Sequence, residues 1–130
     1  LPVAIVHKTR MSGSEVRAHA VVGEVRGRRP LIVDDMISTA GTLEAAVHAL
    51  LDAGSCPPVT MVATHGLLVG PAVERLRNLP QESLLLTNSV PQQYRELPPI
   101  IREVDAAPLL GEAIRRITDN RPLADLLVHR

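Results

Sequence analysis

Short aliphatic runs alternate along the chain with stretches in which apolar residues recur every three or four positions. The runs are continuous rather than alternately apolar and polar, which is typical of strands covered on both faces in a mainly parallel sheet. They predict strands at residues 3–6, 20–22, 31–33, 59–63, 84–87 and 101–104. Residues 8–19 and 91–99 show neither pattern and are predicted to be irregular.

Three helices are predicted among and after these strands. The first ends before Gly54, a residue type common just past helix ends, and the second begins at Pro71. Their apolar stripes are Leu43, Ala46, Val47, Leu50 and Leu51; Val73 and Leu76; and, for the third, Leu110, Ala113, Ile114 and Ile117. Strands alternating with helices predict an α/β fold with an open, mainly parallel sheet flanked by helices, in one domain over residues 1–130.

Composition and charge exclude several classes of function. The 130 residues carry 14 basic and 14 acidic side chains, and this balance argues against a nucleic-acid or anionic-membrane surface. No apolar run is long enough to span a membrane. Tyr94 is the only aromatic residue, so a base-stacking platform is excluded. Cys56 is the only cysteine, which excludes a disulfide framework and a cysteine-based zinc site and indicates a reducing cytoplasm.

The segment 31–42 carries the most informative chemistry. An apolar run is followed by Asp34 and Asp35 and then by a turn of small and hydroxyl residues, which leads into the first predicted helix. We refer to this as the 38–42 turn; its residues are Ser38, Thr39, Ala40, Gly41 and Thr42. Free N–H groups and hydroxyls at the start of a helix are suited to a phosphate. Two carboxylates would repel a phosphate alone, but they could accept hydrogen bonds from a vicinal diol or bind Mg²⁺, so a sugar phosphate would use both halves. The alternative is a pair of solvent-facing carboxylates before an ordinary helix cap.

The pattern Asp34-Asp35-x-x-Ser38-Thr39-Ala40-Gly41-Thr42 resembles the phosphoribosyl-diphosphate loop of the type I phosphoribosyltransferase fold. Residues 63–76 and 107–117 resemble, more narrowly, segments of ribose-phosphate pyrophosphokinases. The resemblance implies a phosphoribosyltransferase-like domain that corresponds to the C-terminal half of a two-domain enzyme. Ser38 is one departure, because most members of that family carry Asp at this position.

The resemblance also implies a reaction, in which an intact diphosphoryl group passes from ATP to the 1-hydroxyl of ribose 5-phosphate. Asp34 and the 38–42 turn would bind ribose 5-phosphate, and Asp35 would support the ribose or a metal-bound water. Mg²⁺ would accompany ATP, with its protein ligands mainly outside this chain. A cytoplasmic homo-oligomer, either a dimer or a hexamer, is expected.

Lys8 and Arg10 resemble the family's Lys-x-Arg segment at the base of a mobile loop. By that resemblance Lys8 is the catalytic lysine, and Arg10 binds phosphate in both catalysis and ribose 5-phosphate recognition. Lys8 is also the only lysine in a chain whose other basic residues are arginines, which suggests a need for a compact charge. Residues 11–15 are small and polar, as in a lid that closes over a substrate, although a plain surface loop has the same composition.

Two other functions share parts of this pattern. A phosphoribosyltransferase that consumes phosphoribosyl diphosphate would share the 38–42 turn, but segments 63–76 and 107–117 argue against it. A non-catalytic regulatory homologue would keep the fold, but intact Lys8 and Arg10 argue against that. His65 is predicted to have a structural role at a strand end, and no metal site is predicted within the chain.

Overall fold

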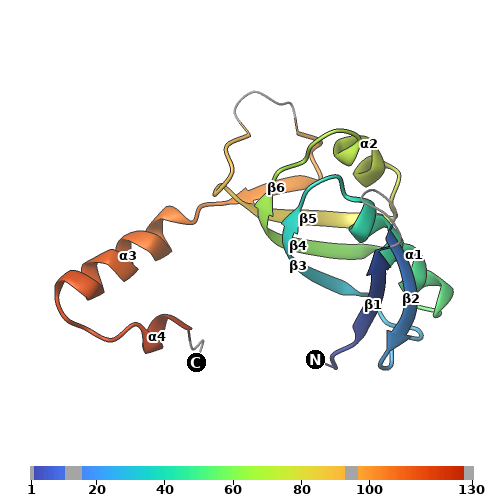
Figure 1. The fold of residues 1–130 in the computed structure, drawn as a ribbon, viewed down its shortest axis with the longest axis horizontal. Coiled ribbons are helices and arrows are strands. Elements are labelled where there is room, and N and C mark those ends of the chain that lie inside the picture. The colour runs from blue at the N-terminus through green and yellow to red at the C-terminus, as the bar shows by residue number, and fades with distance from the viewer. Residues whose placement is uncertain (1, 11–15, 93–96, 128–130) are drawn as a thin grey trace.

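The computed structural model describes the backbone of residues 2–10, 16–92 and 97–127, and the side chains of the same ranges apart from 8–10, 16–19 and 127. Strands and helices alternate between residues 31 and 87 (Figure 1). In chain order they are β1 (Ile5–Arg10), β2 (Val16–Val22), β3 (Leu31–Ile37), α1 (Gly41–Asp52), β4 (Val59–Gly66), α2 (Ala72–Arg77), β5 (Gln81–Thr87), β6 (Ile101–Val104), α3 (Ala107–Thr118) and α4 (Ala124–Leu127).

The main sheet has four parallel strands in the order β3-β4-β5-β6. The predicted α/β fold with a mainly parallel sheet is therefore confirmed. Its core joins side chains of these strands with the inner faces of α1 and α2, and its largest fully buried members are Met61, Leu76, Leu84 and Leu86. One face of each central strand is buried in this core, since buried residues alternate with less buried ones along β4 and β5. The prediction that both faces are covered is wrong for the edge strand β3, where Leu31 and Val33 are exposed. This rigid sheet fixes the ends of β3, β4 and β5, where the candidate chemistry lies.

The first two strands form a separate antiparallel pair that lies beside α1 (Figure 1). The prediction that residues 8–19 are irregular is wrong where these strands extend: Lys8 pairs with Ala18, and Arg10 pairs with Val16. Strand pairing satisfies the backbone whatever the side chains are, and an antiparallel pair tolerates one face in water, so charged residues fit. The predicted strand at 3–6 is shifted, because only its last two residues belong to β1.

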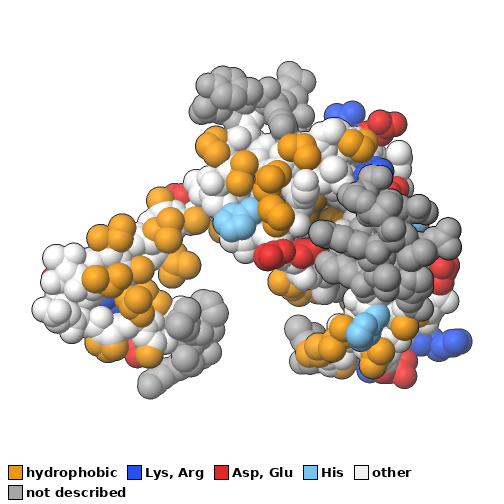
Figure 2. All heavy atoms as spheres, viewed as in Figure 1, with side chains coloured by type: hydrophobic (Ala, Val, Ile, Leu, Met, Phe, Trp, Pro, Cys, Tyr) orange, Lys and Arg blue, Asp and Glu red, His pale blue; other side chains and the backbone are white. Residues whose placement is uncertain are grey.

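The C-terminal helices extend away from the sheet as an arm (Figure 1). The predicted third helix is confirmed as α3, but none of its residues is buried. Its aliphatic stripe, consisting of Leu109, Leu110, Ile114 and Ile117, is between 57% and 65% exposed. Figure 2 shows hydrophobic side chains gathered on this arm. On the main sheet, Val33 of the edge strand β3 is also 72% exposed, so two apolar surfaces face outward.

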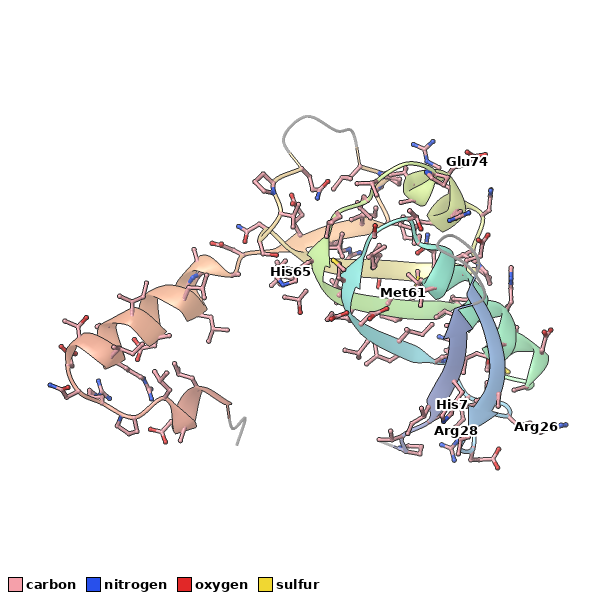
Figure 3. The ribbon with its side chains drawn as sticks, in the orientation of Figure 1. His7, Arg26, Arg28, Met61, His65 and Glu74 are labelled. Carbon is pink, nitrogen blue, oxygen red and sulfur yellow. The ribbon has the colours of Figure 1, made fainter. Side chains whose placement is uncertain are left out.

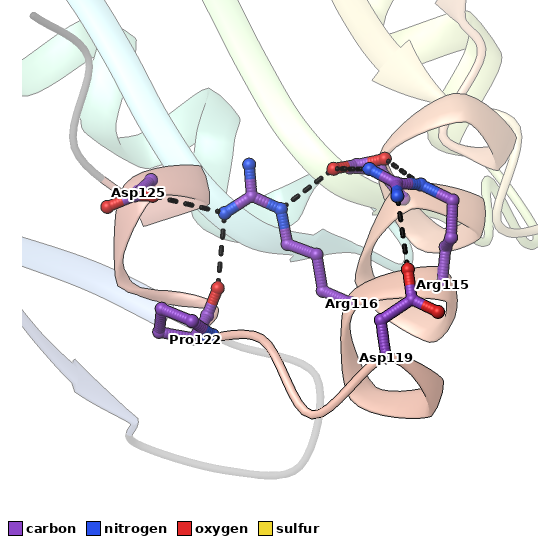
Figure 4. Close-up of polar contacts among 6 residues, drawn as sticks. Arg115, Arg116, Asp119, Pro122 and Asp125 are labelled. Carbon is purple, nitrogen blue, oxygen red and sulfur yellow. Dashed lines mark hydrogen bonds and ion pairs between the residues drawn. The ribbon is translucent and has the colours of Figure 1, made fainter.

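Charged side chains hold the arm together (Figure 4). The Arg116 Nε donates to Glu112 Oε1 at 2.7 Å, and its NH1 donates to the Pro122 carbonyl at 3.1 Å and lies 3.4 Å from Asp125 Oδ2. Arg115 also donates to Glu112. These hydrogen bonds, that from Arg116 first, lower the pKa of Glu112 below its ordinary value. The network links α3 to α4 through Arg116 and Asp125, and none of the residues of α3 is buried.

Candidate functional site

The two adjacent carboxylates lie inside β3 rather than after it. The strand continues to Ile37, so Asp34 is in register with Ala63 of β4, and the backbone N–H of Asp35 donates to Asp34 Oδ1 at 3.0 Å. Because successive side chains of a strand point to opposite faces, Asp34 and Asp35 diverge. Asp34 is half-buried and Asp35 is exposed. The structure therefore does not bring the two carboxylates together on one side of the sheet.

The 38–42 turn joins the end of β3 to the start of α1, as predicted. Its residue Ala40 is buried and has the left-handed backbone conformation, with φ 61° and ψ 3°. No side chain caps α1, and the first backbone bond of the helix runs from the Glu44 N–H to the Ala40 carbonyl at 2.9 Å. The N–H groups of the preceding helical residues have no acceptor one turn back and point out of the helix end. Such groups favour an anion.

The carbonyl groups of this connection are bonded to the segment that follows β4. The Ile37 carbonyl accepts from the N–H groups of Leu67 and Leu68, and the Ser38 carbonyl accepts from the Val69 N–H at 3.0 Å. The Thr39 carbonyl accepts instead from the side chain of Arg75 on α2, whose NH1 lies 3.0 Å away. These carbonyl groups are therefore occupied, whereas the first N–H groups of α1 have no acceptor within the helix.

A polar cluster lies where β4 and β5 end. The Nδ1 of His65 and the Ser89 hydroxyl are 2.8 Å apart (Figure 3 labels His65). The Thr87 and Ser89 hydroxyls both donate to the Thr64 carbonyl, at 2.6 and 3.1 Å. The structural role predicted for His65 is consistent with this contact with the segment that follows β5. Ser89 was not predicted as a site residue, although the run of polar residues directly after an aliphatic strand could have indicated it.

Lys8 and Arg10 have a described backbone position only. They lie on β1 just after a register shift at His7, opposite Ala18 and Val16. Their side chains, and the whole of the predicted lid at 11–15, lie outside the described residues.

A cavity of about 790 Å³ opens between β1, β3 and α1. Most of its lining is aliphatic, and its polar lining includes Asp34 and Thr42, so it adjoins the 38–42 turn. Arg28 and Arg29 are exposed and also line it. Asp34 and Thr42 therefore line the same cavity, and Asp35 does not line it.

Potential metal ligands do not cluster in the described ranges. No group of three or more His, Cys, Asp or Glu side chains there could hold an ion. Nor is any helix within these ranges long and apolar enough to cross a membrane.

Comparison with known proteins gives the family of the chain. The family model described as the phosphoribosyl synthetase-associated domain matches residues 5–128. Curated relatives include a ribose-phosphate pyrophosphokinase of Bifidobacterium longum, 44% identical over 96% of this chain and 37% of that protein. The corresponding protein of Rhodopirellula baltica is 40% identical over 98% of this chain and 40% of its own length. The crystal structure of phosphoribosylpyrophosphate synthetase from Mycobacterium smegmatis superposes with a TM-score of 0.72 and 37% identity, covering 90% of this chain and 37% of that one. The chain thus spans about two fifths of the length of these relatives.

Proposed function

Because the chain belongs to the phosphoribosyl synthetase-associated domain family, we propose that it is the part of a ribose-phosphate pyrophosphokinase that binds ribose 5-phosphate. The complete enzyme would transfer the diphosphoryl group of ATP to the 1-hydroxyl of the bound sugar and release AMP. The observation that carries this proposal is the 38–42 turn. Its donors at the start of α1 have no acceptor within the helix, while the carbonyls of Ser38 and Thr39 are already bonded.

The 5-phosphate would lie against the N–H groups and hydroxyls of the turn, where the positive end of α1 favours an anion. The sugar would then extend toward Asp34, since Asp34 and Thr42 line the same cavity. A carboxylate there can accept hydrogen bonds from two ribose hydroxyls. Asp35 leaves the opposite face of β3, so we assign it only a supporting role at the ribose or at a metal-bound water.

Lys8 and Arg10 would supply positive charge to the transferring group. Phosphoryl-type transfer is accelerated mainly by cations placed where negative charge develops, and Arg10 would also contact the sugar phosphate. Mg²⁺ would accompany ATP. No group of three potential ligands exists among the described residues, and Asp34 and Asp35 diverge, so a carboxylate here would contribute singly beside the phosphates of ATP. We propose that the protein ligands of Mg²⁺ lie mainly outside this chain.

We also propose that the enzyme is cytoplasmic and assembles as a homo-oligomer, either a dimer or a hexamer. The single cysteine, Cys56, is free and exposed, which suits a reducing compartment.

Titration of the ¹⁵N-labelled chain with ribose 5-phosphate, followed by NMR, tests the binding site. We expect the largest amide shifts at residues 38–43, with smaller shifts for inorganic phosphate and the smallest for ribose. Thr42→Val should weaken binding, because it removes a hydroxyl donor from the turn. Thr118→Val is the matched control: its hydroxyl donates to the Ile114 carbonyl on α3, away from the turn, so affinity should not change. Shifts confined to another surface, or equal responses to ribose and ribose 5-phosphate, would contradict the proposal.

A further inference from the structure

Three consecutive carbonyl groups at the end of β3 are held by the segment between β4 and the end of α2. Backbone N–H groups of residues 67–69 hold the first two, those of Ile37 and Ser38, at 2.9 to 3.1 Å. The third, of Thr39, has no such backbone partner among the described residues and accepts instead from the Arg75 NH1 at 3.0 Å. Two of the three carbonyl groups are therefore bonded by the backbone, and the third is bonded by a side chain 36 positions further along the chain.

We propose that Arg75 is a positioning residue for ribose 5-phosphate binding. Its hydrogen bond fixes the direction of the Thr39 carbonyl. Because each peptide group is planar, this also fixes the N–H group that follows, so that the N–H groups of the 38–42 turn are oriented toward the phosphate. The ligand part of this inference rests on the proposed function. The anchoring part stands on the hydrogen bonds alone.

The guanidinium joins two elements at once. While NH1 donates to Thr39, the Nε lies 3.3 Å from Glu44 Oε2 in the first turn of α1. A Cβ added at Gly41 would lie 3.1 Å from NH1, so the guanidinium packs directly against the first residue of that helix. The neighbouring Leu76 is fully buried and fixes α2 on the core. A planar fork holds its donors in a fixed geometry that suits both acceptors, whereas the donors of a lysine ammonium share one atom at the end of a flexible stem.

The turn needs an anchor from outside itself. Ala40 has φ 61°, a conformation that is unfavourable for a residue with a Cβ, and α1 has no side-chain cap. Local preference therefore does not keep these residues in place, so bonds from α2 and the preceding segment must. The ion pair with Glu44 also balances the charge of Arg75, which favours action on the backbone over direct attraction of the phosphate.

The test compares Arg75→Ala, Arg75→Lys and the matched control Arg77→Ala, whose side chain is exposed on the same helix. The first measurement is amide hydrogen exchange without ligand at Glu44 and Val69, whose N–H groups donate to Ala40 and Ser38. The second is ribose 5-phosphate affinity by NMR titration. We expect both Arg75 variants to exchange about tenfold faster at these amides and to bind about tenfold more weakly, the loss that one charge-assisted hydrogen bond implies. The control should stay within about twofold in both measurements, since it loses no such bond.

Each other outcome has a definite reading. Weaker binding with unchanged exchange would mean that Arg75 attracts the phosphate directly, and positioning would be refuted. Full recovery by Arg75→Lys would mean that charge suffices, which would refute the role of the fork. If Arg75→Ala does not fold, Arg75→Lys alone decides. If the unaltered chain does not bind ribose 5-phosphate, the proposed function fails, while the exchange measurement still decides whether Arg75 anchors the turn.

Discussion

Two leucine-to-alanine substitutions should differ severalfold in their cost to stability. Leu84 of β5 is fully buried in the core between the main sheet and its helices, whereas Leu110 of α3 is 59% exposed. Truncation removes three carbon atoms, worth about 2.4 kcal/mol of transfer free energy when they are fully buried. At Leu84 the void left behind raises the expected loss to about 3–5 kcal/mol. At Leu110 only about two fifths of the transfer term applies, so the loss should stay near 1 kcal/mol or below.

Urea unfolding followed by far-ultraviolet circular dichroism measures both losses. We expect the midpoint to fall at an unchanged slope, since neither variant should change the surface exposed on unfolding by much. Met61→Leu serves as the volume-conserving control in the same core and should cost less than about 1.5 kcal/mol. Equal losses for Leu84→Ala and Leu110→Ala would refute the reasoning, because they would mean that the stripe of α3 is buried in solution.

Three further predictions concern chemistry and pH. In the complete enzyme, Lys8→Ala should lower kcat and kcat/KM together by about 10²–10³-fold while ribose 5-phosphate affinity is kept; a rise in KM alone would contradict this. The 130-residue chain alone should bind ribose 5-phosphate weakly and form no AMP from ATP and Mg²⁺, because fixing only the acceptor forfeits proximity; robust turnover would contradict the proposal. Hydrogen bonds from the Ala107 N–H and then from Asn88 lower the pKa of Asp105. These two bonds should therefore be fully formed above the ordinary value of 3.8 and be lost as the pH falls through the lower folded value, as read from the Ala107 amide shift with Asp105→Ala as control.

The strands of the main sheet could be predicted from sequence because burial gives them an aliphatic run. β4, β5 and β6 all begin within three residues of their predicted starts. The prediction ended β3 too early, since Asp34 and Asp35 interrupt the apolar pattern although the backbone stays paired with β4. Charge likewise hid most of β1 and β2, and α4 is only four residues long, too short for a helical period to register.

The candidate site was likewise predicted only in part from the sequence. Residue types at a strand-to-helix junction predicted the 38–42 turn, because small residues and hydroxyls there are a local signal. The hydrogen bond from Arg75 to the Thr39 carbonyl could not be predicted, because the two residues are 36 positions apart. No repeating pattern of residue types connects them. The link between His65 and Ser89 spans 24 positions and was hidden for the same reason. Bonds between a side chain and a distant segment exist only once the core has brought the segments together.

This dependence on the core bears on how the proposed enzyme is built. The 38–42 turn and the helix α2 that carries Arg75 share one hydrophobic cluster, which includes Ala40 and Leu76, so the proposed sugar-phosphate site would rest on a single core. The proposed cations Lys8 and Arg10 stand on β1, in the separate antiparallel pair. Motion of that pair relative to the main sheet would change the distance between these cations and the bound substrate without disturbing the 38–42 turn. Binding of ribose 5-phosphate and transfer of the diphosphoryl group should therefore respond to different substitutions, the first to those around α1 and α2 and the second to those in β1.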